Sequence, residues 1–438
     1  MKKIKYLKKI TPLLFVITPI IIIMGWTTTI IGELIRRQHK PSVFCPWLIS
    51  EQSITPLKNT KHLLVSAYTD QRLGGFDLRI IGVFKRDFVD PLYCSFCCAG
   101  FVSETTPSII LPHSDHFGFP YGTMDVLCRI PDNCDATYVT LLTAPSTVNI
   151  SEQLWIPIRN KKAPKKAENE LNFTVCISTL FGDYNNVLQF AQTLEMYRLL
   201  GVNRVVIYNT SCGPELNRLL KFYSQEGFVE MVPWPIDKYL NPSRGWNFAE
   251  HGGDLHYFGQ ITTLNECIYR SMERSRYVLL NDIDEIIMPY KHDNLNSLMD
   301  SLQPHPNVAE FLIENHIFPK KYFEPSGRFH LPQWSNVPGI NILEHIYRED
   351  PNSSYHPYKM IVQPRLVEQS SVHQLLRNLG EQFYVPKEIC RIIHVRVALL
   401  KSLQLEELNE DKRLWDFQEK LIPNVDKVLR RAGLLTED

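Results

Sequence analysis

The feature that most constrains the fold is a regular alternation of short apolar runs and amphipathic segments between residues 173 and 280. The runs predict strands at 173–180, 204–208, 228–232 and 277–280, and the segments between them predict helices at 184–200, 214–226 and 260–275. Such alternation, with continuous apolar strands, is typical of a parallel sheet covered on both faces. Ligands bind such sheets beyond the carboxyl ends of the strands. We therefore expect an α/β domain with its site at that edge.

Residues 61–160 have a different pattern, which predicts a small β-rich domain. Strands are expected at 63–68, 78–84 and 138–142, separated by turns rich in glycine and proline. Five of the ten cysteines crowd into this stretch: Cys94, Cys97, Cys98, Cys128 and Cys134. In an oxidising compartment they predict two disulfides, with Cys45 available for a third and the connectivity open. A zinc site made by four of these cysteines is the alternative, but their spacing is too wide for an ordinary zinc ribbon.

The N-terminus predicts a membrane anchor. Lysines among residues 2–9 precede an uncharged, mostly apolar run at residues 10–31, which as a helix would be roughly 33 Å long and would span a bilayer. A cleaved signal peptide is the alternative, but its apolar core is usually about 7–15 residues and ends at small residues. We expect a cytosolic tail (1–9), a transmembrane helix (10–31) and a stem (32–60), with the remainder lumenal.

The net charge bears on which partners are expected, and the glycosylation motifs bear on the cellular location. The formal net charge is +0, so a nucleic-acid partner, which needs an excess of basic residues, is not expected. Usable sequons occur at Asn149, Asn172, Asn209 and Asn352, and they permit a lumenal location without requiring it. Asn209 is expected at the carboxyl end of a strand, on the predicted ligand side. Because a glycan there would obstruct the site, we predict that Asn209 is unglycosylated.

The most specific short motif follows the predicted strand at 277–280. It consists of residues 281–285, Asn-Asp-Ile-Asp-Glu. In an extended segment Asp282 and Asp284 point the same way, while Ile283 points back to the core. Two carboxylates at a strand end favour Mg²⁺ or Mn²⁺, with open positions for a diphosphate. A phosphohydrolase with an aspartate nucleophile is the alternative, but such a motif normally lies on the first strand of its domain and continues with threonine.

Several blocks together resemble glycosyltransferase family 92, once called domain of unknown function 23. The resembling blocks are residues 175–182, 257–260, 265–270, 281–286, 359–364, 372–373 and 394–396, and the preceding region around Tyr93-Cys94 is similar to the family's usual companion domain. Their order and rough spacing agree with the family. The resemblance covers residues 171–400, which leaves 401–438 as a C-terminal helical segment.

The resemblance implies a GT-A fold, single-pass type II topology in the Golgi membrane, and inverting transfer of galactose from UDP-galactose to a glycan acceptor with Mn²⁺ (or Mg²⁺). It assigns Asp284 to the metal, and Asp282 to the ribose or a metal-bound water. His394 matches a histidine that often completes the metal shell. The sequence departs from the family at Val395, where the family usually has tyrosine, and this leaves His394 and Arg396 in place.

Other residues are candidates for binding the nucleotide sugar. Lys359 and Arg396 could neutralise the diphosphate, although each could equally be a surface ion pair. His373 could bind substrate or metal, or be an ordinary hydrogen-bonded histidine. Thr179 and Gly182 lie in the loop after the first strand, where the base is expected, and Gly182 would allow close backbone approach.

The inverting step also needs a general base. The sequence does not distinguish between Glu314, Glu324, Glu344 and Asp350, and we take Glu344 as the candidate. Residues 251–256 are interpreted most simply as a flexible loop that contains glycine. A zinc-binding loop is the alternative interpretation. A catalytically inactive lumenal relative that binds glycans or serves as a scaffold is the alternative function. The acceptor and the oligomeric state are not determined by the sequence.

Overall fold

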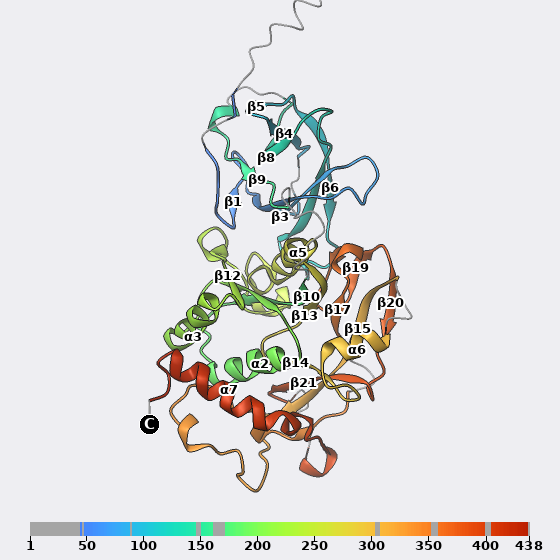
Figure 1. Ribbon diagram of the computed structural model, residues 1–438. Coiled ribbons are helices and arrows are strands. Elements are labelled where there is room, and N and C mark those ends of the chain that lie inside the picture. Colours follow the sequence, from blue (N-terminus) through green and yellow to red (C-terminus); the bar gives the residue numbers. More distant parts are fainter. Residues whose placement is uncertain are drawn as a thin grey trace, which may run out of the picture.

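The computed structural model describes residues 44–45, 48–87, 90–145, 150–160, 171–302, 307–351, 358–398 and 404–436. These residues form two nine-stranded sheets together with two small two-stranded sheets. Figure 1 shows the first large sheet at the top of the molecule, above the second sheet and its helices. The chain therefore has a β-rich N-terminal unit and a larger unit that follows it.

The first sheet is antiparallel, in the order β1-β2-β3-β7-β6-β4-β8-β9, with β5 beside β4. Its strands are β1 (Thr55–Pro56), β2 (Leu63–Thr69), β3 (Leu78–Lys85), β4 (Tyr93–Cys98), β5 (Phe101–Val102), β6 (Thr106–Pro112), β7 (Tyr121–Cys128), β8 (Ala136–Leu142) and β9 (Ile156–Pro157). β2, β3 and β8 confirm the strands expected here. Three disulfides cross-link this unit: Cys45–Cys97, Cys94–Cys128 and Cys98–Cys134. Disulfide pairing is thus confirmed, and the zinc alternative is wrong.

The second sheet begins with the strands that the sequence predicted. β10 (Leu171–Leu180), β11 (Arg204–Asn209), β12 (Val229–Pro233) and β13 (Ser275–Leu280) are mutually parallel, in the order β12-β11-β10-β13. The intervening helices are α2 (Val187–Leu199), α3 (Pro214–Gln225), α4 (Phe248–His251) and α5 (Gln260–Ser271). Buried apolar residues of α2 and α3 share one core with β10 and β11, and residues of α5 pack on the opposite face.

The remainder of the second sheet comes from strands that the sequence did not predict. They are β14 (Glu285–Pro289), β15 (Val308–Pro319), β17 (Tyr358–Val362), β20 (Glu381–Tyr384) and β21 (Cys390–Arg396), and the small sheets add β16 (Tyr347–Arg348), β18 (Val367–Ser370), β19 (Leu375–Asn378) and β22 (Asn409–Glu410). β17 runs antiparallel to both β13 and β15. The remaining helices are α6 (Leu295–Leu302) and α7 (Gln418–Arg431), and α7 crosses the lower face in Figure 1.

The expected fold class, α/β with a GT-A-type catalytic domain and an N-terminal transmembrane helix, is wrong. In the described residues strands dominate, and both large units are built on nine-stranded sheets. Strand–helix alternation ends after β13: between residues 285 and 396 the described chain contains several strands but only α6 as an α-helix. The prediction extended the pattern of residues 173–280 over a region in which neighbouring strands supply the packing instead of helices.

The predicted localisation also has to be corrected. The expected transmembrane helix, residues 10–31, lies outside the described residues. Among the helices that are described, none is long and apolar enough to cross a membrane. The described residues therefore give no support for the predicted single-pass type II anchor.

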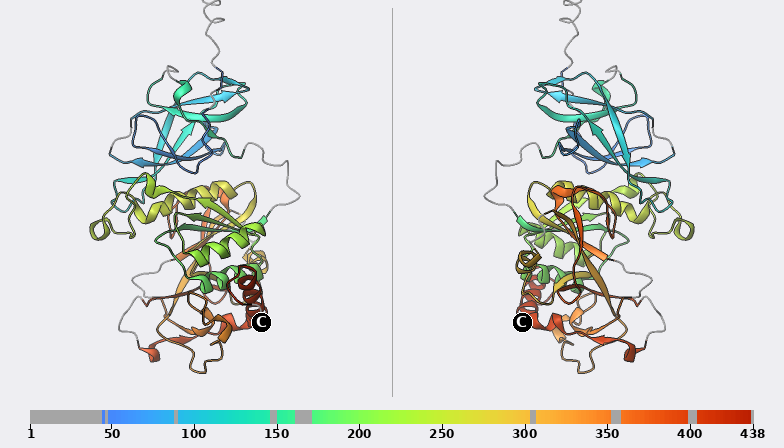
Figure 2. Two further views of the ribbon diagram at one scale, coloured as in Figure 1. Left: turned by 90° about the vertical axis from the view of Figure 1, so that its left-hand side faces the viewer. Right: turned by 90° about the vertical axis from the view of Figure 1, so that its right-hand side faces the viewer.

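Helix α5 joins the two large sheets. Figures 1 and 2 show it between them, and one buried apolar cluster runs from β2 and β3 through α5 to β13. Glu266 of α5 accepts hydrogen bonds from Tyr68 of β2, at 2.6 Å, and from Tyr208 of β11. A disulfide, Cys176–Cys267, ties α5 to β10. The N-terminal sheet is thus packed against the helix that leads into β13.

Candidate active site

The acidic motif lies in a turn held by a buried asparagine at the carboxyl end of β13. Asn281 donates to the hydroxyl of Tyr197 at 2.6 Å and to the carbonyl of Glu285 at 2.9 Å. The side chains of Asp282 and Asp284 are 40% and 33% exposed, whereas Ile283 between them is 6% exposed. The two carboxylates therefore reach solvent while Ile283 anchors the turn in the core.

A buried lysine faces this turn from β17. Lys359 Nζ lies 2.9 Å from Asp282 Oδ2 and 3.3 Å from Glu285 Oε2. Burial would raise the pKa of Asp282, but the Lys359 charge outweighs it and the pKa is lowered. Burial dominates at Glu285 and raises the pKa of that carboxyl. Asp282 thus stays ionised and is paired with Lys359, and Asp284 is the carboxylate with more freedom to bind a cation.

His394 of β21 faces the same turn. Its Nε2 lies 3.3 Å from Asp284 Oδ2, and its Nδ1 lies 3.3 Å from Glu285 Oε1 and 3.1 Å from Asn315 Nδ2. Burial lowers the pKa of His394, but the charges of Asp284 and Glu285 outweigh it, so that the pKa is raised overall. β21 pairs with β14, with Glu285 opposite His394, and this pairing brings the two together across the sheet.

The donor set fits a hard divalent cation that keeps open positions. Asp284 and His394 are adjacent, and they supply one carboxylate and one imidazole. Within the described ranges, no three His, Cys, Asp or Glu side chains are arranged to hold a metal on their own. Mg²⁺ and Mn²⁺ commonly take few protein ligands and complete their shells with water and phosphate oxygens. Of the predicted trio, Asp284 and His394 are in contact, whereas Asp282 is paired with Lys359.

The loop after β10 contains the predicted base-binding residues. Thr179 Oγ1 lies 3.3 Å from the carbonyl oxygen of Tyr257, and Gly182 has a φ of +66°. A Cβ at Gly182 would lie 3.8 Å from the guanidinium of Arg244, which is exposed. No sequence pattern singles out Arg244, because it lies in an irregular segment more than sixty residues further along the chain. The loop thus has a cation beside it that was not anticipated.

His373 lies in the turn between β18 and β19. Its Nδ1 is 2.8 Å from the carbonyl oxygen of Tyr358, the residue before Lys359. Because a carbonyl only accepts, Nδ1 carries the proton and Nε2 keeps its lone pair. Arg396 is exposed at the end of β21, two residues beyond His394. Both residues stay predicted substrate contacts.

The structure does not bring Glu344 into direct contact with the acidic turn. Glu344 ends the 3₁₀ helix η5 (Ile342–Glu344), and its carboxylate lies 3.1 Å from His330 Nδ1. Glu314, another of the candidate bases, pairs across β15 and β17 with Tyr358, directly beside Lys359. Its carboxylate is 2.7 Å from His316 Nε2.

Other residues around the acidic turn received no role from the sequence. Gln260, the first residue of α5, lies 3.4 Å from Asp282 Oδ1 through its amide nitrogen. Glu285 and Asn315 hold Lys359 and His394 in place. Tyr184 is held neutral by burial and by the charge of Asp284, which together raise its pKa. Glu285 comes directly after Asp284, so its position in the motif could have identified it. The other residues are remote from the motif in sequence, and no local pattern distinguishes them.

Comparisons with known proteins identify the family of this chain. The model of glycosyltransferase family 92 matches residues 172–431. Over 246 residues the chain is 22% identical to Beta-1,4-galactosyltransferase galt-1 of Caenorhabditis elegans, covering 55% of this chain and 54% of that protein. Over 243 residues it is 27% identical to Glycosyltransferase family 92 protein F13G3.3 of the same organism, covering 54% and 45%. The chain thus spans about half the length of these relatives. Since the family match takes in more than half of this chain and contains the whole acidic turn, the protein belongs to glycosyltransferase family 92.

Proposed function

We propose that this glycosyltransferase is metal-dependent and transfers galactose, with inversion, from UDP-galactose to a glycan acceptor. The observation that carries the proposal is the convergence of Asp282, Asp284, Lys359 and His394 at the end of β13. Galactose is proposed because a relative is named as a β-1,4-galactosyltransferase. Inversion rests on the family resemblance.

In this proposal Asp284 and His394 bind Mn²⁺ or Mg²⁺. The metal, when bound, supplies positive charge that stabilises the leaving diphosphate. Lys359 keeps Asp282 ionised and fixed in orientation, so that the Asp282 carboxylate is available to a ribose hydroxyl or to a metal-bound water. Glu285 is buried, and it helps to hold both Lys359 and His394. The division of roles therefore follows from the contacts of each side chain.

Two arginines near this edge of the sheet are proposed to bind the diphosphate. Arg244 and Arg396 are both exposed. A guanidinium offers several donors in a fixed plane, which suits phosphate oxygens. Lys359, a predicted diphosphate contact, is instead 3% exposed and engaged with carboxylates. Thr179 and Gly182 are proposed to approach the base.

The acceptor hydroxyl has to lose a proton during inverting transfer. Glu344 stays the predicted general base, and Glu314 is its alternative because it lies beside Tyr358 and Lys359. Matched variants separate the two, since replacing the base lowers kcat strongly while leaving the binding of UDP unchanged. Glu344→Gln and Glu314→Gln are the informative pair.

The test uses the full chain with Mn²⁺ and each common UDP- and GDP-sugar, with and without a mixed glycan pool, and measures the nucleotide released. Release of UDP from UDP-galactose that requires the metal and is lost in Asp284→Ala supports the proposal. Release of nucleotide from a different nucleotide sugar alone would show that this compound, and not UDP-galactose, is the donor. A folded protein that neither binds UDP nor turns over any donor would favour a catalytically inactive glycan-binding relative.

A further inference from the structure

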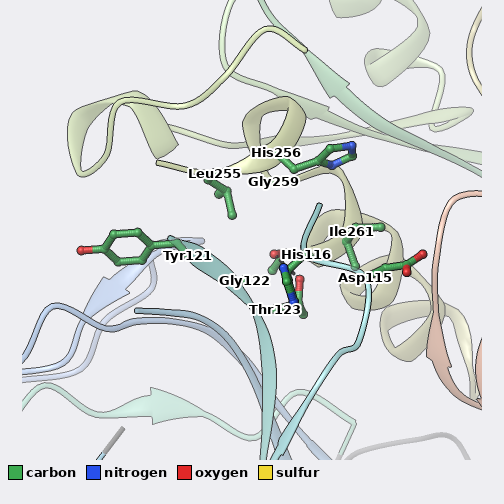
Figure 3. Close-up of a pocket in the computed structure, with 10 residues that line it drawn as sticks. Asp115, His116, Tyr121, Gly122, Thr123, Leu255, His256, Gly259 and Ile261 are labelled. Carbon is green, nitrogen blue, oxygen red and sulfur yellow. Dashed lines mark hydrogen bonds between the residues drawn. The ribbon is translucent and has the colours of Figure 1, made fainter. Parts of the chain in front are cut away.

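A small pocket with both polar and apolar residues in its lining lies where the N-terminal sheet meets the second unit. Asp115 and His116, from the β6–β7 loop, and Thr123 of β7 line one side. His256 and Gly259, from the 3₁₀ helix η3 (His256–Gly259), and Thr262 of α5 line the other. Figure 3 shows the two groups facing each other, with His256 across from Asp115 and His116. The pocket therefore exists only because the two units pack together.

His256 is the most informative of these residues. Its side chain is buried, at 4% exposure, and within the described structure its Nδ1 has no hydrogen-bond partner. The ring stacks on Phe117 at 4.2 Å and contacts the edge of Phe119 at 6.1 Å, so that its orientation is held by packing. Burial lowers the pKa of His256 to about 3, and the ring is neutral. A buried polar atom without a partner costs about 1–3 kcal/mol, which a ligand hydroxyl would recover.

The opposite side of the pocket supplies complementary groups. Asp115 accepts a hydrogen bond from Ser371 through Oδ2, which leaves Oδ1 to accept from a ligand. His116 Nδ1 accepts from the backbone N–H of Gly118 at 3.1 Å, so that the proton of the neutral ring is on Nε2. Burial and then Arg86 lower the pKa of His116 and keep it neutral. The pocket thus offers both a donor and acceptors, as hydroxyl groups require.

The pocket is connected directly to the acidic turn at both ends. Gly259 precedes Gln260, whose amide lies 3.4 Å from Asp282. Ser371, which is bound to Asp115, lies two residues before His373. His373 Nδ1 in turn lies 2.8 Å from the carbonyl oxygen of Tyr358, the residue before Lys359. A ligand in the pocket would be adjacent to the proposed donor site.

We infer that this pocket binds a hydroxyl group of the acceptor sugar, and that the N-terminal unit therefore forms part of the acceptor site. The inference rests on the proposed glycosyltransferase function. Asp115 is the carboxylate that lines the pocket, and the two histidines that line it have lowered pKa values. The guanidinium of the exposed Arg86 lies nearby and donates to the carbonyl of Phe119 at 2.7 Å, so that its charge offsets that of Asp115 and a neutral ligand is favoured. A diphosphate would meet the carboxylate of Asp115. A neutral polyol matches the available donors and acceptors.

The test measures binding of sugars and of nucleotide separately in the full chain. The probes are the methyl glycosides of glucose, galactose, mannose and N-acetylglucosamine, followed by saturation-transfer NMR in the presence of Mn²⁺ and UDP. The variants are His256→Phe, which keeps the ring stacked on Phe117, and Asp115→Asn, which can still accept from Ser371. Asp132→Asn, an exposed carboxylate of the same unit, is the matched control.

We expect at least one glycoside to bind the wild type and Asp132→Asn, and to bind His256→Phe and Asp115→Asn about tenfold more weakly, as the loss of one hydrogen bond predicts. UDP affinity should be unchanged in all of them. Equal glycoside binding by the variants, or no binding of any glycoside to the wild type, overturns the inference. If either variant fails to unfold cooperatively, His116→Gln at the same pocket replaces it. Absence of UDP binding to the wild type would instead count against the proposed function.

Discussion

The ammonium of Lys359 lies 2.9 Å from the carboxylate of Asp282, although 77 residues separate them in the chain. The contact arises because β17 runs antiparallel beside β13, with Met360 opposite Leu280. It divides the acidic pair into two different groups: Asp282 is held by a cation within the protein, and Asp284 is adjacent to His394. Two aspartates that look equivalent in the sequence therefore have different environments.

Replacing Lys359 with methionine should destabilise the protein. Lys359 and Glu285 are buried, so the variant leaves carboxylates without their cation, and breaking a buried pair costs about 3–5 kcal/mol. Because Asp282 is 40% exposed, we expect the free energy of unfolding to fall by the lower end of this range, about 3 kcal/mol. Urea unfolding measures the change. Lys291→Met, at an exposed lysine, is the control; equal effects of the two variants would contradict the proposed importance of the pair.

Asp284→Asn should reduce metal-dependent turnover by at least about 100-fold, since even indirect support of a metal ligand is commonly worth 10–100-fold in affinity. The protein should unfold at nearly the same temperature as the wild type, because Asp284 is partly exposed. Initial rates at several Mn²⁺ concentrations provide the measurement, with Asp293→Asn as the exposed control. A variant with wild-type metal dependence would exclude Asp284 as a ligand.

Removing the Cys176–Cys267 disulfide should lower the free energy of unfolding by about 2–4 kcal/mol, because the bridge closes a long loop of the unfolded chain. The cysteines are 91 residues apart, and the bridge ties β10 to α5. The double variant Cys176→Ala with Cys267→Ala is compared in guanidinium with Cys212→Ala, which removes an unpaired cysteine. We expect the double variant alone to shift the midpoint substantially; a larger shift in Cys212→Ala would refute this.

Glu266 should contribute to stability in a pH-dependent way. Burial would raise the pKa of Glu266, but Arg270 outweighs this and the pKa falls to about 2. A lowered pKa means that the contribution is present above the unfolded value of about 4.5 and is lost as the pH falls toward 2. The free energy of unfolding of wild type and Glu266→Gln, measured between pH 7 and pH 2.5, should therefore converge in acid. A constant gap between them would show that Glu266 acts through packing alone.

Asn209 should carry no glycan in active protein, despite its sequon. It is the last residue of β11, and its side-chain nitrogen lies 3.6 Å from Cys212 Sγ, within the turn that follows the strand. The nitrogen that would be glycosylated is thus engaged with Cys212. Peptide mass spectrometry of protein secreted from a glycosylating host checks this; a glycan on Asn209 of an active preparation would contradict the position of this strand end beside the ligand.

Local patterns predicted a large part of the fold. The strands of residues 171–280 and the helices between them lie close to their expected positions, because β-branched runs and helical periodicity act over only a few residues. The clustered cysteines are all in disulfides, although their connectivity, and the bridge from Cys176 to Cys267, depend on distances that spacing does not encode. The strands after residue 285 were missed because no periodic pattern separates buried strands in a mixed sheet from irregular segments.

The acidic turn, His394 and Lys359 were recognisable from residue types and their order. Their partners were not: Glu285, Asn315 and Gln260 reach the turn from separate elements, and Asp115 comes from the other unit altogether. Glu344, selected as the base without a geometric argument, lies beside His330 instead.

By itself the sequence determined the strands and helices of residues 171–280 and the residue types of the acidic turn, because hydrophobic periodicity and carboxylate spacing are local properties of the chain. Tertiary structure decided which of two neighbouring aspartates is paired with Lys359, which strands complete the second sheet, and that a pocket forms where Asp115 meets His256. These features depend on the pairing of strands and the packing of units that are remote in sequence. Contacts between residues that are far apart in the chain do not produce a local sequence pattern around either residue.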